Sequence, residues 1–351
     1  PLHHHDGPAP RLERLFAFQL AEEGVCRTVT AMSWNKVNQD VLAAAYGTFH
    51  YAPGLGGRVH FWSLRNPEHP ERSLRLESPA TTLDFSASRP NLLAVGTYDG
   101  AVAVYDTARG PEDGEDGDPG APVRQSGDSD GKHTDPVWQV RWLDKGPERG
   151  ETLVSISTDG RVVEWATKKG LAHTTLMALK SVGNTEGVIS RQASGMCLDF
   201  PLNDINAYFA GTEDGIIHKC SPSYNEQSLE TFAGHTGPVY RLRCSPFWQQ
   251  AFLSCSADWT VKLWCQKQTE PMYSFLSTDL SDEVLDITWS PSNSTLFASV
   301  TGDGRIELWD LKQSQLDPIL RKFKKKPVIE HNSRPHTSAD STGDSEGGSE
   351  A

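Results

Sequence analysis

Apolar and polar positions follow the same order six times along the chain. Each copy begins with an apolar stretch of period-2 alternation, which predicts a β-strand with one buried face. A second apolar stretch ends in small residues, an Asp or Gly marks a turn, and a third strand follows. In five copies the turn aspartate lies six residues before the closing residue, in the pairs Asp99 and Tyr105, Asp159 and Trp165, Asp214 and Cys220, Asp258 and Trp264, and Asp303 and Trp309. This constant offset indicates internal repeats.

The six copies together predict an all-β fold. The clearest copies lie at residues 133–165, 234–264 and 284–310, and weaker copies lie at 32–62, 83–106 and 196–220. A four-stranded sheet of this kind cannot cover both of its own faces, so such sheets stack radially around a channel as the blades of a β-propeller. We therefore expect six recognisable blades.

The two best copies each contain a His, a Ser, the turn Asp and a closing Trp. These sets are His133, Ser155, Asp159 and Trp165, and His235, Ser254, Asp258 and Trp264. A buried His and Asp destabilise a blade unless they are hydrogen bonded. We expect each set to form a buried hydrogen-bonded chain with a structural rather than a catalytic role.

Composition restricts the propeller to part of the chain. Hydrophobic residues make up 37% and charged residues 23% of the 351 residues. Segments 110–132 and 331–351 are almost free of apolar residues, so they cannot bury enough surface to offset the entropy cost of ordering. We expect a disordered N-terminal end at 1–14, the propeller at 15–320 with a disordered acidic loop at 110–132, and a basic then acidic disordered tail at 321–351.

The net charge of −13 argues against nucleic acid as a partner. A local basic run near the C-terminus is the exception, and it comprises Arg321, Lys322, Lys324, Lys325 and Lys326. Such a run would suit a polyanion, but a solvated tail after the last strand is the favoured interpretation. We find no signal peptide and no stretch of about 18 apolar residues, so no membrane association is expected.

Motifs of catalysis and of cofactor or metal binding are not found in the sequence. There is no phosphate-binding Gly-Lys-Ser/Thr loop, no dinucleotide-binding glycine pattern, no nucleophile elbow and no His-Glu-x-x-His. The six cysteines are scattered without a Cys-x-x-Cys pair, which is typical of reduced thiols in a cytosolic protein rather than of a disulfide framework or zinc site. We expect no enzyme activity, cofactor or metal. The first residue is Pro1, which indicates a fragment or a processed chain.

Several phrases of the sequence resemble the dynein intermediate chains, a family of WD-repeat proteins. They include Thr134-Asp-Pro-Val-Trp-Gln-Val-Arg-Trp142, the segments 155–165 and 211–224, Phe252-Leu-Ser-Cys-Ser-Ala-Asp-Trp-Thr-Val-Lys-Leu-Trp264, and 31–35 with 44–47. The similarity keeps its order and spacing from about Leu15 to about Leu311. The Arg-Asn-Pro-Glu block at 65–68 is more similar to the axonemal branch of the family than to the cytoplasmic branch.

The resemblance implies a non-catalytic scaffold in an axonemal dynein motor complex. In that family the propeller grips the tail of a dynein heavy chain, and an N-terminal extension recruits light chains and a second intermediate chain. No such extension precedes the repeats here, so light-chain binding is not expected of residues 1–351. The implied locations are the cytoplasm, the cytoskeleton and the axoneme of the cilium, with a role in ciliary or flagellar movement. The alternative is a WD-repeat substrate receptor or adaptor of another complex, such as a ubiquitin ligase.

The family resemblance implies seven blades, whereas the sequence contains six copies of the pattern. Leu15 to Leu20 resembles the outer strand that would complete the last blade. The ring either stays open or closes on six blades, and we favour an open ring, incomplete at its C-terminal end. An open ring exposes a strand edge and one blade face.

Partner contacts are expected at turns and strand entries on the rim of the propeller. The candidates are Trp138, Tyr240 and Trp259, with Arg161 and Arg305 as polar contacts, because aromatic residues and Arg dominate interface hot spots. Trp138 and Tyr240 could equally pack between neighbouring blades. Trp259 occupies the Gly position of its turn, where a large ring has no evident purpose in folding.

Overall fold

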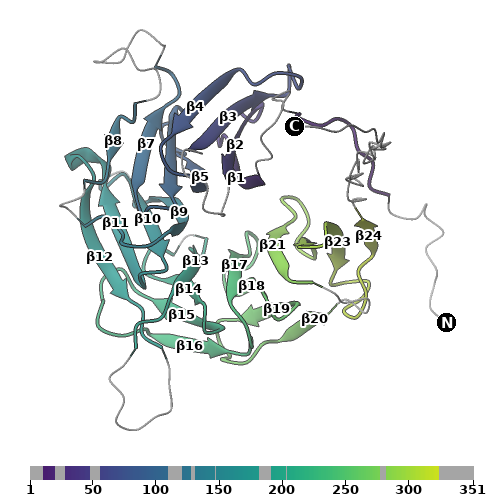
Figure 1. Cartoon of the computed structure of the whole chain (residues 1–351). Helices are drawn as coiled ribbons and strands as arrows, with labels where there is room; N and C mark the ends of the chain where they lie inside the picture. Colours follow the sequence, from purple (N-terminus) through teal and green to yellow (C-terminus); the bar gives the residue numbers. More distant parts are fainter. Residues whose placement is uncertain are drawn as a thin grey trace, which may run out of the picture.

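The computed structural model describes residues 11–19, 28–47, 56–109, 121–127, 131–146, 148–181, 191–202, 204–276 and 282–323. In these residues 24 strands form six four-stranded sheets around a central channel, as Figure 1 shows. Each sheet is antiparallel and its strands are adjacent in the order of the sequence. The prediction of an all-β propeller with six recognisable blades is therefore confirmed.

The sheets are called blades 1 to 6. Blade 1 contains β1 (Thr28–Trp34), β2 (Val41–Gly47), β3 (Gly57–Ser63) and β4 (Arg72–Leu76), and blade 2 contains β5 (Ala80–Phe85), β6 (Leu92–Thr97), β7 (Val102–Asp106) and β8 (Arg124–Gln125). Blade 3 contains β9 (Val137–Asp144), β10 (Glu151–Ser157), β11 (Arg161–Ala166) and β12 (Ala172–Ala178), with the short 3₁₀ helix η1 (Thr167–Lys169) before β12. Blade 4 contains β13 (Gly195–Asp199), β14 (Tyr208–Thr212), β15 (Ile216–Cys220) and β16 (Glu230–Ala233). Blade 5 contains β17 (Val239–Cys244), β18 (Ala251–Ser256), β19 (Thr260–Cys265) and β20 (Tyr273–Leu276), and blade 6 contains β21 (Val284–Trp289), β22 (Leu296–Thr301), β23 (Arg305–Asp310) and β24 (Leu320–Phe323).

The predicted disordered segments mostly lie outside the described residues, which exclude 1–10, 110–120, 128–130 and 324–351. Two parts of that prediction are wrong. Residues 321–323 of the predicted tail belong to β24, and the acidic loop predicted at 110–132 contains β8, the outer strand of blade 2. Ala103 and Val104 of β7 pair with Gln125 and Arg124, and the Val102 N–H donates to the Ser126 hydroxyl at 3.0 Å. The acidic loop contains few apolar residues, so its own sequence does not predict a strand. Pairing with β7 holds Arg124 and Gln125 in the extended conformation.

The two faces of each blade pack against different neighbours. In blade 5, Phe252 and Trp264 stack with their rings 6.0 Å apart and pack with Phe209 of blade 4. Leu253 and Leu263 alternate with them in sequence and pack against blade 6. The period-2 pattern seen in the sequence thus supplies both faces of every internal interface between blades.

Side chains of several inner strands also reach the backbone of the next blade. The Thr82 hydroxyl on β5 accepts the Val140 N–H at 3.2 Å, and Asp84 accepts the Trp142 N–H at 2.8 Å. Between later blades, the side-chain oxygen of Gln139 accepts the Leu198 N–H at 3.0 Å, and Asp199 accepts the Cys244 N–H at 2.7 Å. These bonds satisfy buried polar groups and tie each of these blades to its neighbour.

The ring is open between blades 6 and 1 in the described part of the chain. The inner strands β1, β5, β9, β13, β17 and β21 pack side by side in sequence, but β21 and β1 lack packing of this kind (Figure 1). Residues 11–19 contact both flanking blades. The Phe18 ring lies 5.2 Å from the Trp62 ring of blade 1, and Lys322 Nζ of blade 6 donates to the Leu12 carbonyl at 2.7 Å.

The predicted outer strand at 15–20 does not form, because residues 15–19 belong to no sheet. Residue 20 lies outside the described residues. Phe18 instead covers the apolar face of blade 1 made by Leu42, Ala44 and Trp62, while Leu15 is 86% exposed. A single, partly buried aromatic anchor therefore replaces the expected ladder of backbone hydrogen bonds.

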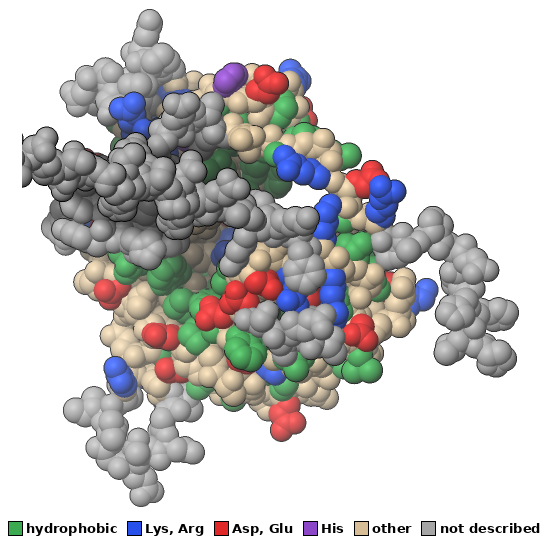
Figure 2. All heavy atoms as spheres, turned by 45° about the vertical axis from the view of Figure 1, so that its right-hand side comes forward, with side chains coloured by type: hydrophobic (Ala, Val, Ile, Leu, Met, Phe, Trp, Pro, Cys, Tyr) green, Lys and Arg blue, Asp and Glu red, His purple; other side chains and the backbone are tan. Residues whose placement is uncertain are grey.

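The surface near blades 5 and 6 carries mixed charges. Figure 2 shows acidic and basic side chains interspersed there, with hydrophobic side chains between them. Such a surface suits docking through a few anchors rather than through one broad apolar patch.

Candidate docking surface

Blade 3 holds one complete chain of His, Ser, Asp and Trp. His133 Nδ1 lies 2.9 Å from an Asp159 carboxylate oxygen, and His133 Nε2 lies 2.8 Å from the Ser155 hydroxyl. The Trp165 indole N–H donates to the same hydroxyl at 2.8 Å. The structure thus brings together all four residues of the first predicted set.

Blade 5 repeats the arrangement with shorter bonds. His235 lies 2.8 Å from Asp258 and 2.6 Å from the Ser254 hydroxyl, which accepts the Trp264 indole N–H at 2.7 Å. Asp258 also accepts the backbone N–H of Thr236 at 3.1 Å, across the loop that enters the blade. The chain therefore ties the β18–β19 turn to the loop before β17.

The charge states of these chains follow from burial and pairing. Burial alone would raise the pKa of Asp159, but the hydrogen bond and charge of His133 outweigh it, and the pKa falls to about 2. The pKa of Asp258 lies well below its ordinary value for the same reasons. Burial lowers the pKa of His235, although Asp258 opposes this shift. Each Asp is thus an ionised structural anchor that is already occupied by its hydrogen bonds.

Trp259 is presented by the turn that this chain holds. Its backbone has φ of 70°, in the left-handed region that disfavours residues with a Cβ, and its side chain is 47% exposed. Gly160 and Gly304 occupy the same place in blades 3 and 6, with φ of 73° and 85°. A strained position that exposes a large ring is typical of a functional rather than a stabilising residue.

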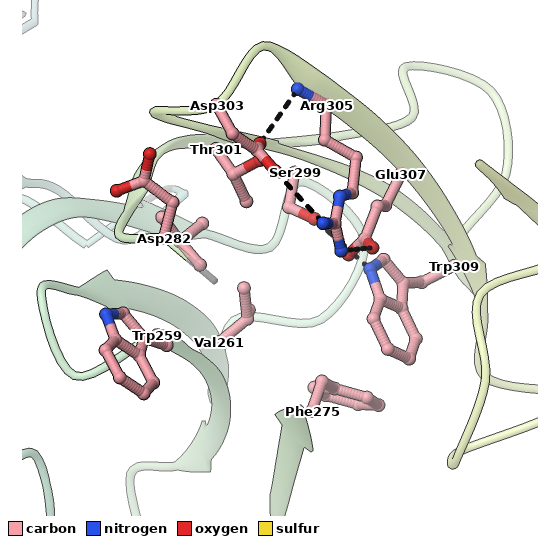
Figure 3. Close-up of a pocket in the computed structure, with 11 residues that line it drawn as sticks. Trp259, Val261, Phe275, Asp282, Ser299, Thr301, Asp303, Arg305, Glu307 and Trp309 are labelled. Atoms are coloured by element: carbon pink, nitrogen blue, oxygen red, sulfur yellow. Dashed lines mark hydrogen bonds and ion pairs between the residues drawn. The ribbon is translucent and has the colours of Figure 1, made fainter. Parts of the chain in front are cut away.

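Arg305 does not lie where the sequence suggested. It is 5% exposed, with its guanidinium 3.0 Å from Asp303 and 3.7 Å from Glu307, inside the pocket drawn in Figure 3. No His precedes blade 6 in residues 271–283, and the Arg305–Glu307 pair is buried beside Trp309 instead. The prediction of Arg305 as an exposed contact is therefore wrong, because the side chain pairs inside the blade with buried Glu307 and partly buried Asp303.

Trp138 and Tyr240 share a structural feature that the sequence did not reveal. Both lie at a β-bulge, because the pairing of β9 skips Trp138 and that of β17 skips Tyr240. The Trp138 indole N–H donates to the Thr158 hydroxyl at 2.5 Å, and the Tyr240 hydroxyl donates to Glu283 at 2.7 Å. Each ring is half-buried and still reaches the surface, and the Tyr240 ring packs against the apolar cluster between blades 5 and 6. Bulges re-aim side chains in this way.

Arg161 completes the set on the blade-3 side. Its guanidinium lies 2.8 Å from Asp159 and donates to the Lys132 carbonyl at 2.8 Å, and its side chain is 26% exposed. We call Trp138, Arg161, Tyr240 and Trp259 the turn-end residues, because all four lie where strands β9, β11, β17 and β19 begin, at one end of the propeller.

The pocket beside Trp259 is too small for a ligand. Its volume is about 10 Å³, which is the space that one water molecule needs. Among the described residues no group of three or more His, Cys, Asp or Glu side chains could hold a metal ion. In the same residues no helix is long and apolar enough to cross a membrane.

Comparison with known proteins agrees with this architecture. The family model described as WD domain, G-beta repeat matches residues 226–265 and 270–310, which cover blade 5 and most of blade 6. Among curated proteins, the chain is 45% identical over 330 residues to "Dynein axonemal intermediate chain 4" of Xenopus laevis, covering 89% of this chain and 43% of that protein.

More distant relatives carry similar names. "Dynein intermediate chain 2, ciliary" of Heliocidaris crassispina is 36% identical, covering 86% of this chain and 43% of the relative. "Dynein, 78 kDa intermediate chain, flagellar outer arm" of Chlamydomonas reinhardtii is 35% identical, covering 84% of this chain and 43% of the relative. The chain thus spans less than half the length of these relatives. Across that span, it belongs to the axonemal branch of the dynein intermediate chain family.

Proposed function

We propose that this chain is a non-catalytic scaffold of an axonemal dynein motor complex in the cilium or flagellum. Its propeller docks onto the tail of a dynein heavy chain and so supports ciliary movement. Relatives with 35–45% identity carry axonemal, ciliary or flagellar dynein names, which supports a role in the same machinery. WD-repeat propellers commonly serve as rigid platforms, because their blades fix loops in space.

The contact set of the proposal is the turn-end residues, with Trp259 as its anchor. The observation that carries it is the exposed ring of Trp259 on a left-handed backbone, where blades 3 and 6 have Gly. A Trp that is rigidly presented loses little entropy on binding and supplies a large contact area. Trp138 and Tyr240 would flank it with partly exposed rings, and Arg161 would supply hydrogen-bond donors.

Other partners would bind outside the region described. The relatives extend well beyond the matched segment, since it covers 43% of their length. We place light chains and a second intermediate chain on such an extension rather than on the propeller. The cytoplasm, the cytoskeleton and the axoneme are the corresponding locations.

The test is a binding assay between purified residues 1–351 and an axonemal heavy-chain tail, by biolayer interferometry. Trp259→Ala should weaken binding at least tenfold, as expected for a hot-spot aromatic residue. Trp248→Ala is the matched control, because Trp248 is 49% exposed in the same blade but lies in the β17–β18 loop at the opposite end. This control should bind as the unchanged protein does.

The outcomes separate the parts of the proposal. Equal weakening by both substitutions would exclude the turn end as the specific surface. Failure of the unchanged protein to bind any heavy-chain tail would contradict heavy-chain docking itself. Binding to ubiquitin-ligase subunits in the same assay, without heavy-chain binding, would favour the alternative receptor function.

A further inference from the structure

The inner strands carry charged side chains that the docking surface does not use. On strand β17, Arg241 and Arg243 occupy alternate positions, and Arg141 and Asp199 lie on the neighbouring strands β9 and β13. These strands border the central channel (Figure 1). The three arginine side chains are 23–32% exposed, so part of each is open to solvent beside the channel.

The carboxylates of this cluster are already engaged. One oxygen of Asp199 lies 2.5 Å from Arg141, and its other oxygen accepts the Cys244 N–H at 2.7 Å. Asp286 accepts a hydrogen bond from Arg241 Nε at 3.1 Å and another from the Ile287 N–H at 2.8 Å, through the same oxygen. Both acidic groups therefore neutralise an arginine other than Arg243.

Arg243 is left with weak partners among the described residues. Its Nη1 donates to the Leu242 carbonyl at 3.5 Å, and its Nη2 lies 4.0 Å from Asp286. A guanidinium carries five N–H donors in a rigid fork that matches two oxygens at once. Most of these donors are thus available to a further acceptor.

The electrostatic environment of Arg243 points the same way. Burial lowers the pKa of Arg243, and the nearby positive charges of Arg141 and Arg241 lower it further. The nearby carboxylates Asp199 and Asp286 oppose this lowering only in part, and Asp84 of β5 adds a third negative charge near Arg141. A bound anion would relieve the repulsion and accept the unused donors.

We propose that Arg243, with Arg141 and Arg241, forms a site for an anionic oxygen group, a phosphate or a carboxylate, on the channel wall between blades 3 and 5. This site lies on the inner strands and does not depend on heavy-chain docking. A phosphate compound and an acidic side chain share the recognising chemistry, which is charge-assisted hydrogen bonding to a guanidinium fork.

The experiment is calorimetric titration of purified residues 1–351 with two probes at constant ionic strength. Sodium tripolyphosphate represents the phosphate source, and a hexaglutamate peptide represents the carboxylate source. Arg243→Gln should weaken the binding of the tighter probe at least tenfold. Arg75→Gln is the matched control, because it removes the same charge from the exposed outer strand β4, and it should leave the affinity unchanged.

Arg243→Lys keeps the experiment decisive if Arg243→Gln does not fold. It retains the charge and loses the fork, so affinity should fall at least threefold. Tighter binding of tripolyphosphate would assign the site to phosphate, and tighter binding of hexaglutamate would assign it to acidic residues. Binding of neither probe, or equal loss in the Arg243 and Arg75 variants, would overturn the proposal.

Discussion

Blades 5 and 6 follow one sequence pattern but differ in their surroundings. In blade 5, Leu253 and Leu263 are buried against blade 6. The equivalent face of blade 6 is only partly buried, and it comprises Leu296, Ala298, Val300, Ile306 and Leu308. Blade 5 also has the complete His235 chain, whereas blade 6 buries Arg305 and Glu307 instead. Two blades with the same apolar pattern should therefore differ in stability. A blade is stabilised fully only when a neighbouring blade buries its second face and its buried polar side chains are hydrogen bonded.

The largest difference between the two blades should appear at matched leucines. Leu263→Ala should lower the free energy of unfolding by roughly 2–4 kcal/mol, because it leaves a cavity between blades 5 and 6. Leu308→Ala, at the same place in blade 6, should cost about 1 kcal/mol, because its side chain is already partly exposed. Urea unfolding followed by tryptophan fluorescence measures both. Equal losses would show that the open face is covered in solution.

A second pair tests the polar chains. Ser254→Ala should cost about 2–3 kcal/mol, since it leaves His235 and the Trp264 indole N–H buried without their shared partner. Ser299→Ala in blade 6 should cost about 1 kcal/mol, because within the described residues the Ser299 hydroxyl bonds to one group, the Trp309 indole N–H, at 3.2 Å. The same unfolding assay applies. A larger loss for Ser299 would mean that the Arg305–Glu307 pair depends on this serine.

The hydrogen-bonded chain of blade 3 should make the free energy of unfolding depend on pH in the acid range. The pKa of Asp159 falls from 3.8 to about 2 on folding, so its contribution of about 2 kcal/mol is present above pH 4 and is lost as the pH falls towards 2. Unfolding free energies measured between pH 5 and pH 2 should therefore decline. Asp159→Asn should be less stable at pH 7 and should show a shallower decline. An unchanged slope in that variant would contradict the assigned role.

The smallest effect should have the opposite sign. Trp259→Gly removes the left-handed strain that Gly304 avoids at the same place in blade 6, and it should stabilise the protein by up to about 1 kcal/mol. Differential scanning calorimetry should record a rise in Tm of about 2 °C. A fall in Tm would indicate that the ring packs more strongly than its exposure suggests.

The fold could be predicted from sequence because its signals are local. The alternation of each strand and the offset between Asp258 and Trp264 depend on neighbouring residues alone. The two His-Ser-Asp-Trp sets were identified for the same reason. Strand β8 was not predicted, since Arg124 and Gln125 become a strand only by pairing with β7.

The candidate surface was predicted less completely because burial depends on distant residues. Arg305 follows a turn, as Arg161 does. Its side chain is buried in blade 6, however, because it forms ion pairs with Asp303 and Glu307. Trp138 and Tyr240 lie at bulges, which a sequence with uniform strand character does not reveal. Trp259 stood out because Gly is the ordinary residue at a position with positive φ.

Two of the bonds between inner strands have a consequence for synthesis on the ribosome. Asp84 accepts a hydrogen bond from the Trp142 N–H, and Asp199 accepts one from the Cys244 N–H. Both donors come later in the sequence, so each acceptor is synthesised before its donor. A nascent blade therefore leaves these two carboxyl groups to be hydrated by water until its successor has been translated. Assembly should proceed from the first blade to the last, with each new sheet templated on the one before it.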